Sequence, residues 1–343
     1  MKTIGFPGLG LEFNIDPTAF TIFGLDIQWY GIILSLGIVF AFLLFYRNAK
    51  KKEGIDEDTI FNITLLVVPI AIIGARFVYV ATKWDYYKTK TFLDMINIRA
   101  GGIAIYGAII FGLVTVLIYN KIKKTKSLAM LDALAPAVML GQIVGRWGNF
   151  VNGEAYGWSE GVENLPWRMW LEKVYIDGHL TDYHLVHPTF IYESLWNAIG
   201  LVLILAFLYR NKKFDGEIFC AYMSWYGLGR AFIESIRADS LYLVGNLKFS
   251  VFVGIAAFIG GLILGIVLYK RNKNEQEELS EYKPAFESVR MSTAKEADAL
   301  DESVFETEEY TEEETDEDDE ITLAEQDMLD GDINDTDNES EEE

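Results

Sequence analysis

Long apolar runs recur along the first 270 residues of this chain and limit the folds available to it. They cover residues 29–46, 60–81, 103–120, 128–146, 190–209, 217–236 and 249–269. A helix rises about 1.5 Å per residue, so about 20 apolar residues cross the hydrocarbon core of a bilayer. The runs predict an all-α polytopic integral membrane protein with about seven transmembrane helices. The least regular is 217–236, which contains Glu217, Arg230 and Glu234.

The net charge of −22 is concentrated near the C-terminus. Residues 274–343 hold 30 acidic and three basic side chains, a net charge of −27, which leaves +5 for residues 1–273. Few large apolar residues interrupt this acidic segment, so burial cannot offset the entropy cost of ordering it. We expect residues 271–343 to be a disordered acidic tail behind a mildly basic, apolar body.

Basic residues cluster after every second run and predict the orientation of the chain. The clusters are Arg47 with Lys50–Lys52, Lys121–Lys126, Arg210–Lys213 and Lys270–Lys273. By the positive-inside rule these loops are cytoplasmic, although the 82–102 loop is also mildly basic. Residues 1–28 are then an extracytoplasmic N-terminal segment, and 29–270 form the transmembrane domain. Its longest connection, 147–189, is a small extracytoplasmic head between helices four and five, and the tail is cytoplasmic.

Several polar side chains fall inside or beside the apolar runs, where charges are costly and often functional. In the predicted orientation all lie in the outer half of the membrane: Tyr30, Arg76, Tyr106, Arg146, His187, Glu193, Tyr226, Arg230, Glu234 and Arg237. Singly, each has a structural explanation, such as an interfacial anchor or an Arg230–Glu234 ion pair four residues apart. Several arginines at one depth favour instead a pocket for an anionic head group, because guanidinium groups bind phosphate bidentately.

The segment "GRWGNFVNGEAYG" at residues 145–157 suits such a pocket. Its glycines allow tight turns and a close approach of the backbone to a ligand. Arg146 and Asn149 are three residues apart, so a helical turn places them on one face. Asn149 and Asn152 supply amide donors, and Glu154 supplies an acceptor.

Cysteine and histidine usage gives little sign of other chemistry. Cys220 is the only cysteine and stands in an apolar run, where it is expected to act as a small hydrophobic residue. The three histidines share the loop before residue 188 without a persuasive set of zinc ligands. We expect no metal, no cofactor, no nucleic-acid partner and no cleavable signal peptide.

The segment at 145–157 and several other motifs resemble those of a known family, the bacterial phosphatidylglycerol–prolipoprotein diacylglyceryl transferases. The long segment at 145–157 is highly specific, and the resemblance covers about residues 25–270. It extends to "DIQWYGI", "GAR" at 74–76, "GGIAIYG" at 101–107, "LDALAPAVMLGQIVGR", "HPTFIYE" and "YGLGRAFIESIR".

The resemblance implies a seven-helix enzyme of the bacterial inner membrane. It would transfer the diacylglyceryl group of phosphatidylglycerol to the lipobox cysteine thiol of a prolipoprotein signal peptide, releasing glycerol 1-phosphate. Its partners would be phosphatidylglycerol, prolipoproteins and membrane lipids. Arg146 and Arg230 match the family's essential arginines, and other matching positions tied to activity or binding are Tyr30, Asn149, Glu154, Gly157, Tyr226, Glu234 and Arg237.

One position departs from the family pattern. Many members carry histidine where Tyr106 stands, and that histidine is often proposed as catalytic. An unperturbed phenol has a pKa of about 10, so it accepts a proton less readily than imidazole near neutral pH. We include Tyr106 with Arg146 and Arg230 in the catalytic set and favour a positioning role, although Tyr106 or His187 could assist thiol deprotonation.

The remaining candidates are expected to bind substrate. Arg146 and Arg230 are assigned to the phosphate, with Glu234 orienting Arg230, while Arg76 and Arg237 are weaker head-group candidates. The other predicted substrate-binding residues are Tyr30, Asn149, Asn152, Glu154, Gly157, His187 and Tyr226. Two alternatives stay open on the sequence: a transporter for an anionic or lipid head group, and a membrane scaffold whose tail recruits a partner.

Overall fold

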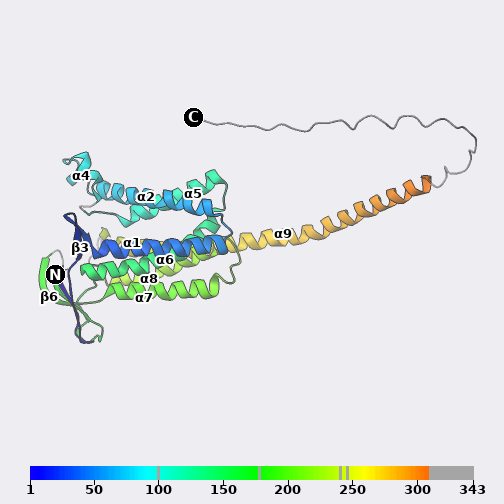
Figure 1. Ribbon diagram of the computed structural model, residues 1–343. Coiled ribbons are helices and arrows are strands. Elements are labelled where there is room, and N and C mark those ends of the chain that lie inside the picture. Colours follow the sequence, from blue (N-terminus) through cyan, green and yellow to red (C-terminus); the bar gives the residue numbers. More distant parts are fainter. Residues whose placement is uncertain (99–100, 177–178, 239–241, 245–246, 309–343) are drawn as a thin grey trace, which may run out of the picture. The chain divides into compact units, whose positions relative to one another are not determined.

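The computed structural model describes residues 1–98, 101–176, 179–238, 242–244 and 247–308. The chain divides into two units, residues 1–277 and residues 278–343. The first unit contains every site residue predicted from the sequence. It is a bundle of long helices with a layer of strands at one end (Figure 1).

The described residues of the first unit form ten helical segments. Its long helices are α1 (Trp29–Lys51), α2 (Glu57–Thr82), α5 (Ile105–Lys123), α6 (Ser127–Asn152), α7 (Thr189–Leu203), α8 (Glu217–Ser235) and α9 (Phe249–Glu308), the last of which continues beyond Glu277. A π-helical segment, η2 (Ile204–Leu208), prolongs α7. Two short helices, α3 (Trp84–Tyr87) and α4 (Phe92–Ile96), lie in the predicted 82–102 loop.

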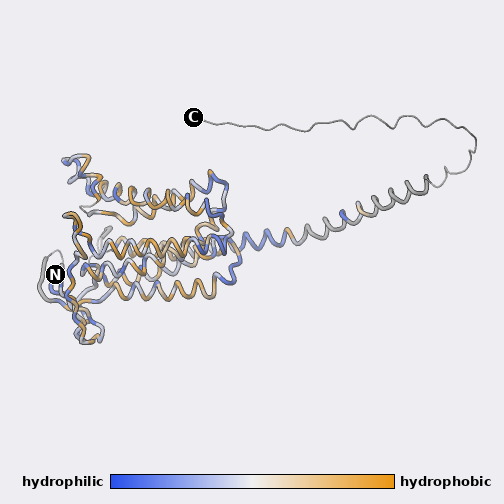
Figure 2. The backbone as a smooth tube through the Cα atoms, in the orientation of Figure 1, coloured by the Kyte–Doolittle hydropathy of each residue, from blue (hydrophilic) through white to orange (hydrophobic). Residues whose placement is uncertain are grey.

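Six of the described helical stretches are long and apolar enough to cross a membrane. They are 29–51, 57–82, 105–123, 127–152, 189–208 and 249–280. Large apolar side chains remain exposed on them, such as Leu65 (72% exposed) and Ile73 (64%), which suits contact with lipid. Figure 2 shows this apolar character along the bundle. The mostly helical membrane fold is therefore as predicted.

The sixth predicted span, 217–236, differs from the others in composition. Residues 217–235 do form a helix, α8, but Glu217, Arg230 and Glu234 lower its apolar character. Apolar length alone therefore identifies six spans among the described residues, and the prediction of seven is not confirmed.

Helix α6 lies at the centre of the packing. It contacts α1, α7 and α8, whereas α2 packs chiefly against α5. Met130 and Met139 of α6 are fully buried. Helix α8 also approaches α9 closely: a Cβ atom at Gly227 would lie 2.6 Å from the Gly254 carbonyl oxygen. This contact between small residues brings the start of α9 beside the second half of α8.

The strand layer joins the N-terminus to the connection before α7. Strands β1 (Lys2–Phe6), β2 (Leu11–Ile15), β5 (Met169–Ile176) and β6 (His179–Val186) form an antiparallel sheet in the order β2-β1-β5-β6. Two hairpins, β3 (Thr18–Ile22) with β4 (Leu25–Gln28) and β7 (Tyr242–Val244) with β8 (Leu247–Lys248), complete the strands. The buried hydrophobic cluster between this sheet and α7 includes Ile4, Met169 and Phe190.

The predicted head, 147–189, has different boundaries in the structure. Residues 147–152 continue α6, which ends at Asn152 because Gly153 adopts a left-handed conformation with φ of +58°. Strand β1 of the N-terminal segment also pairs with β5 of this connection, so the two segments share one sheet. The helix stop is therefore about six residues later than the apolar pattern suggested.

The start of the predicted disordered tail is helical. Helix α9 runs to Glu308, and ion pairs four residues apart, Arg271–Glu275 and Lys273–Glu277, stabilise its polar part. The most acidic stretch, residues 309–343, lies outside the described residues. Disorder there stays a prediction.

Candidate active site

A chain of ion pairs lies at the end of the bundle nearest the strand layer. Glu193, near the start of α7, is 2% exposed, and its carboxylate contacts two arginines from different helices. One oxygen pairs with Arg146 of α6, and the other lies 3.2 Å from Nη1 of Arg230 on α8. Arg230 also pairs with Glu234 across 2.7 Å, and Arg237 Nε lies 3.7 Å from the same Glu234 oxygen. Positive and negative side chains therefore alternate along this arginine network.

The network brings together residues that the sequence separates by about 90 positions. Arg146, Arg230, Glu234 and Arg237 were predicted site residues, and the structure places them in one connected group. Glu193 was noted as an outer polar residue but received no role. Its signal was an acidic side chain at the start of an apolar run, which needs a buried partner.

Tyr106 reaches this network through a residue that the sequence did not indicate. Its hydroxyl donates a hydrogen bond to Ser250 Oγ across 2.9 Å, and Nη2 of Arg230 lies 3.5 Å from the same oxygen. The Tyr106 ring packs edge-to-face on Phe249, with centroids 5.0 Å apart. A single serine at the start of an apolar run carries no pattern, so only the contact between α8 and α9 reveals Ser250.

The end of α6 supplies the next group of predicted residues. Nη1 of Arg146 donates to Asn149 Oδ1 across 3.4 Å, in agreement with their expected common face. One turn later the Asn152 amide donates to the Glu154 carboxylate. Tyr30 of α1 lies against this helix, because a Cβ at Gly148 would be 2.8 Å from its ring.

Two tyrosines interact electrostatically with the arginines. Tyr226 of α8 lies within electrostatic reach of Glu193, Arg230 and Arg146, and its ring stacks on that of Tyr222 at 5.8 Å. Tyr30 likewise lies within electrostatic reach of Arg146 and Glu154. Both phenols therefore face the charged end of the bundle.

Gly157 lies where three backbone segments meet. Its N–H donates to the His187 carbonyl across 2.9 Å, and it forms an isolated β-bridge with Arg237. A Cβ atom here would lie 2.7 Å from the Cβ of His187 and 2.9 Å from the Ile236 carbonyl oxygen. Gly157 is thus a close-packing position that joins the loop after α6 to the start of α7 and the end of α8.

His187 is placed beside this junction, and its contacts lie away from the arginines. Its Nδ1 lies 3.2 Å from the Tyr192 hydroxyl. Burial lowers the pKa of His187 below its ordinary value, so the imidazole is neutral near pH 7. These contacts of the His187 side chain do not reach the arginine network.

Arg76 has contacts of a different kind from the other arginines. Its five N–H donors are directed to the carbonyl oxygens of Asp94, Met95, Gly101 and Gly102 and to the Tyr87 hydroxyl, at distances of 2.7–3.3 Å. Guanidinium has five donors, so the four carbonyl oxygens and the Tyr87 hydroxyl saturate the side chain. The structure does not join Arg76 to the arginine network.

Comparison with known proteins shows the family to which this chain belongs. A family model described as prolipoprotein diacylglyceryl transferase matches residues 17–267. A phosphatidylglycerol–prolipoprotein diacylglyceryl transferase of Finegoldia magna is 45% identical over 265 residues, which covers 77% of this chain and all of the relative. The chain belongs to the prolipoprotein diacylglyceryl transferase family.

Other relatives extend this match. The enzyme of the same name from Lysinibacillus sphaericus is 43% identical over 77% of this chain and 95% of its own length. The one from Clostridioides difficile is 40% identical over 77% of this chain and all of its own length. Family membership and the apolar helices make this chain a multi-pass bacterial membrane protein. The arginine network falls wholly within the matched region.

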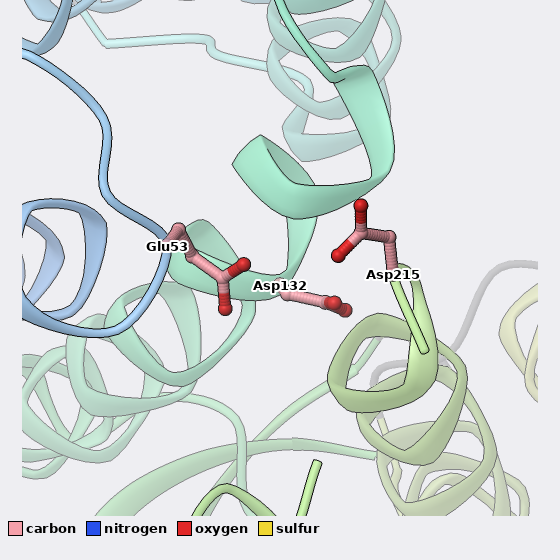
Figure 3. Close-up of side chains that lie close together, drawn as sticks. All are labelled: Glu53, Asp132 and Asp215. Carbon is pink, nitrogen blue, oxygen red and sulfur yellow. The ribbon is translucent and has the colours of Figure 1, made fainter. Parts of the chain in front are cut away.

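A second polar cluster lies at the other end of this diacylglyceryl transferase bundle. Asp132 and Arg146 are both on α6, 14 residues and therefore about 21 Å apart along the helix. Around Asp132 the carboxylates of Glu53 and Asp215 converge from other elements (Figure 3), with oxygens within 4.8 Å of one another.

This carboxylate cluster already contains a cation. Nζ of Lys212 lies 2.5 Å from Glu53, 2.8 Å from Asp132 and 3.2 Å from Asp215. An ammonium group has three donors, so the three carboxylates saturate it. Fully buried Asp132 also accepts the Gly216 N–H across 2.7 Å. The cluster therefore ties the connection after α1, and α6, to the loop before α8 without requiring a metal.

Proposed function

We propose that this chain transfers the diacylglyceryl group of phosphatidylglycerol to the lipobox cysteine thiol of prolipoproteins. The products are a thioether-linked lipid and glycerol 1-phosphate. Family membership supports the activity, since the relatives are named for phosphatidylglycerol and prolipoprotein. The observation that supports the site is the convergence of Arg146 and Arg230 on one buried carboxylate.

The reaction determines what the arginines do. The thiol sulfur attacks the glycerol carbon that bears the phosphate, the carbon–oxygen bond breaks, and the phosphate oxygen keeps the electron pair. The thiol releases a proton, because the thiolate is the reactive form. Negative charge grows on the departing phosphate, so donors fixed in advance lower the barrier. Arg146 and Arg230 supply these donors.

The neighbouring side chains support the two arginines. Glu234 orients Arg230, and Asn149 orients Arg146, through their observed contacts. Asn152 and Glu154 bind glycerol hydroxyls or hold the loop after α6. Tyr106 positions Arg230 through Ser250 and does not act as the base.

Three further residues complete the proposed substrate site. Tyr30 and Tyr226 border the head group, and Arg237 is a weaker phosphate ligand that extends the network. Their phenols and guanidinium group offer donors to phosphate and glycerol oxygens. Arg76 is not part of this proposed head-group site, because four backbone carbonyl oxygens and the Tyr87 hydroxyl accept from all of its donors.

We also propose that the active-site end faces the cell exterior. The basic clusters that follow α1 and α5 then lie in the cytoplasm, as the positive-inside rule requires. A cysteine at exposed position Glu163 should react with a membrane-impermeant reagent in intact cells, whereas a cysteine in the 309–343 tail should not. The reverse labelling pattern would contradict this orientation.

Transfer to a lipobox peptide tests the function directly. Membranes containing wild-type protein, Arg146→Gln or Arg230→Gln are supplied with phosphatidylglycerol and peptide, and the lipidated peptide is quantified. We expect each variant to lose at least 100-fold in rate, because a lost donor to the growing charge costs about 2.7–4 kcal/mol. Arg47→Gln, at an exposed position on the opposite end of α1, is the control and should be fully active. Wild-type rates in a folded Arg146 or Arg230 variant would contradict the phosphate assignment.

A further inference from the structure

Glu193 is unusual because its negative charge lies where an anionic substrate has to bind. Its side chain is 3% exposed, and those of Arg146 and Arg230 are 18% and 15% exposed. Each carboxylate oxygen serves a different arginine, so Glu193 fixes the separation of the two guanidinium groups. A buried carboxylate is tolerated only when it is paired, and this pairing satisfies that condition.

The charge of the ligand changes during the proposed reaction. A phosphodiester carries one negative charge. A phosphate monoester has a second pKa of about 6 and therefore carries nearly two negative charges at neutral pH. Two arginines without a counter-charge would hold the dianionic product more tightly than the monoanionic substrate, because Coulomb attraction grows with charge. Slow release of that product would then limit turnover.

We propose that Glu193 is the specificity-determining counter-charge of the site. It holds Arg146 and Arg230 in place for a monoanionic phosphodiester and, by repulsion, weakens binding of the dianionic monoester that the reaction releases. This inference rests on the proposed function. Glu234 forms an ion pair with Arg230, whereas Glu193 is the carboxylate, among the described residues, that forms ion pairs with both Arg146 and Arg230.

Two water-soluble probes of different charge test this role. Glycerophosphoglycerol, the deacylated head group, is a monoanionic diester, and glycerol 1-phosphate is the dianionic product. Each is titrated as an inhibitor of peptide lipidation by purified full-length protein in phosphatidylglycerol vesicles at pH 7.5. The measured quantity is the ratio of the two inhibition constants, which separates charge selectivity from overall activity.

The variants are Glu193→Gln, Glu193→Asp and the control Glu163→Gln, which removes an exposed carboxylate elsewhere in the chain. In wild type we expect the monoester to bind no more tightly than the diester. Glu193→Gln should shift the ratio at least tenfold towards the monoester and lower kcat more than it raises the phosphatidylglycerol KM. Glu193→Asp, which keeps the charge, and Glu163→Gln should keep the wild-type ratio.

The outcomes separate this inference from the proposed function. Absence of transfer by wild type contradicts the function itself. Transfer by wild type with an unchanged ratio in folded Glu193→Gln contradicts only the counter-charge role. If Glu193→Gln does not fold, the wild-type ratio still decides, because a tenfold preference of wild type for the monoester would overturn the inference.

Discussion

The Tyr106 hydroxyl and Ser250 Oγ lie 2.9 Å apart, although 144 positions separate the two residues. This hydrogen bond joins the start of α5 to the start of α9. It also places the Tyr106 phenol one side chain away from Arg230. A tyrosine that is linked to an arginine in this way can position it without accepting a proton.

Tyr106→Phe should therefore lower the transfer rate by less than about tenfold, because one hydrogen bond contributes about 0.5–1.5 kcal/mol. Ser250→Ala should give a similar loss, and the double variant should be little worse than either single one. The measurement is kcat for peptide lipidation by the four proteins. Additive losses, or a loss above 1000-fold in Tyr106→Phe alone, would contradict the positioning role.

Arg76→Gln should destabilise the protein and leave the substrate affinity of the folded fraction unchanged. The substitution removes donors from the part-buried carbonyl oxygens of Asp94, Met95 and Gly101, and an orphaned acceptor costs up to about 1–3 kcal/mol when it is shielded from water. Thermal unfolding in detergent should show a lower Tm, while KM for phosphatidylglycerol stays within about twofold of wild type. A large rise in KM at unchanged Tm would restore the head-group role first predicted for Arg76.

Gly157→Ala should reduce transfer at least tenfold, because the new methyl group would meet the Cβ of His187 at 2.7 Å. The three segments at this junction would separate and shift the ends of α7 and α8, which carry the arginine network. Gly145→Ala is the matched control, since a Cβ there meets nothing within 4 Å. Equal activity of the two variants, measured at equal expression, would argue against a packing role for Gly157.

Stability should fall when the pH is lowered through the range just below 6.5, and His187 should account for part of this fall. Burial lowers its pKa in the folded state below the ordinary value of 6.5. The unfolded chain therefore binds more protons in that range, so folding stability increases with pH there and is lost on acidification. The Tm difference between pH 7.5 and pH 5.5 should be smaller in His187→Gln than in wild type. An identical difference would show that His187 does not contribute.

Lys212→Met should unfold or severely destabilise the protein, because it leaves Asp132 and Glu53 as buried charges without a counter-charge. Removing one partner of a buried ion pair costs about 3–5 kcal/mol. Although burial opposes the charged form, hydrogen bonds to Asp132 and Glu53 raise the pKa of Lys212 above its ordinary value, so the ammonium persists until strongly alkaline pH. Chelators should leave the wild-type Tm unchanged. A Tm that falls with a chelator and recovers with a divalent cation would show that the cluster binds metal.

The sequence by itself determined the membrane helices and most of the site's residue types. Apolar runs of spanning length must form helices in a bilayer, because no other element satisfies the backbone there. The common level of Arg146, Arg230 and Tyr106 along the bundle follows from alternating helix directions. The stop of α6 was predicted too early, since Arg146 and Asn149 look like a helix end although the left-handed Gly153 ends it.

Only the tertiary structure decided which of these side chains meet. Helical position predicts the depth of a residue, but the face that it presents to a neighbour depends on packing between helices distant in sequence. Helix packing places Glu193 in ion pairs with two arginines and brings Tyr106 within hydrogen-bond distance of Ser250. It also directs Arg76 to backbone carbonyl oxygens such as that of Gly102. Burial is the physical reason: a charged group inside the bundle must find a partner, and the fold determines which one is within reach.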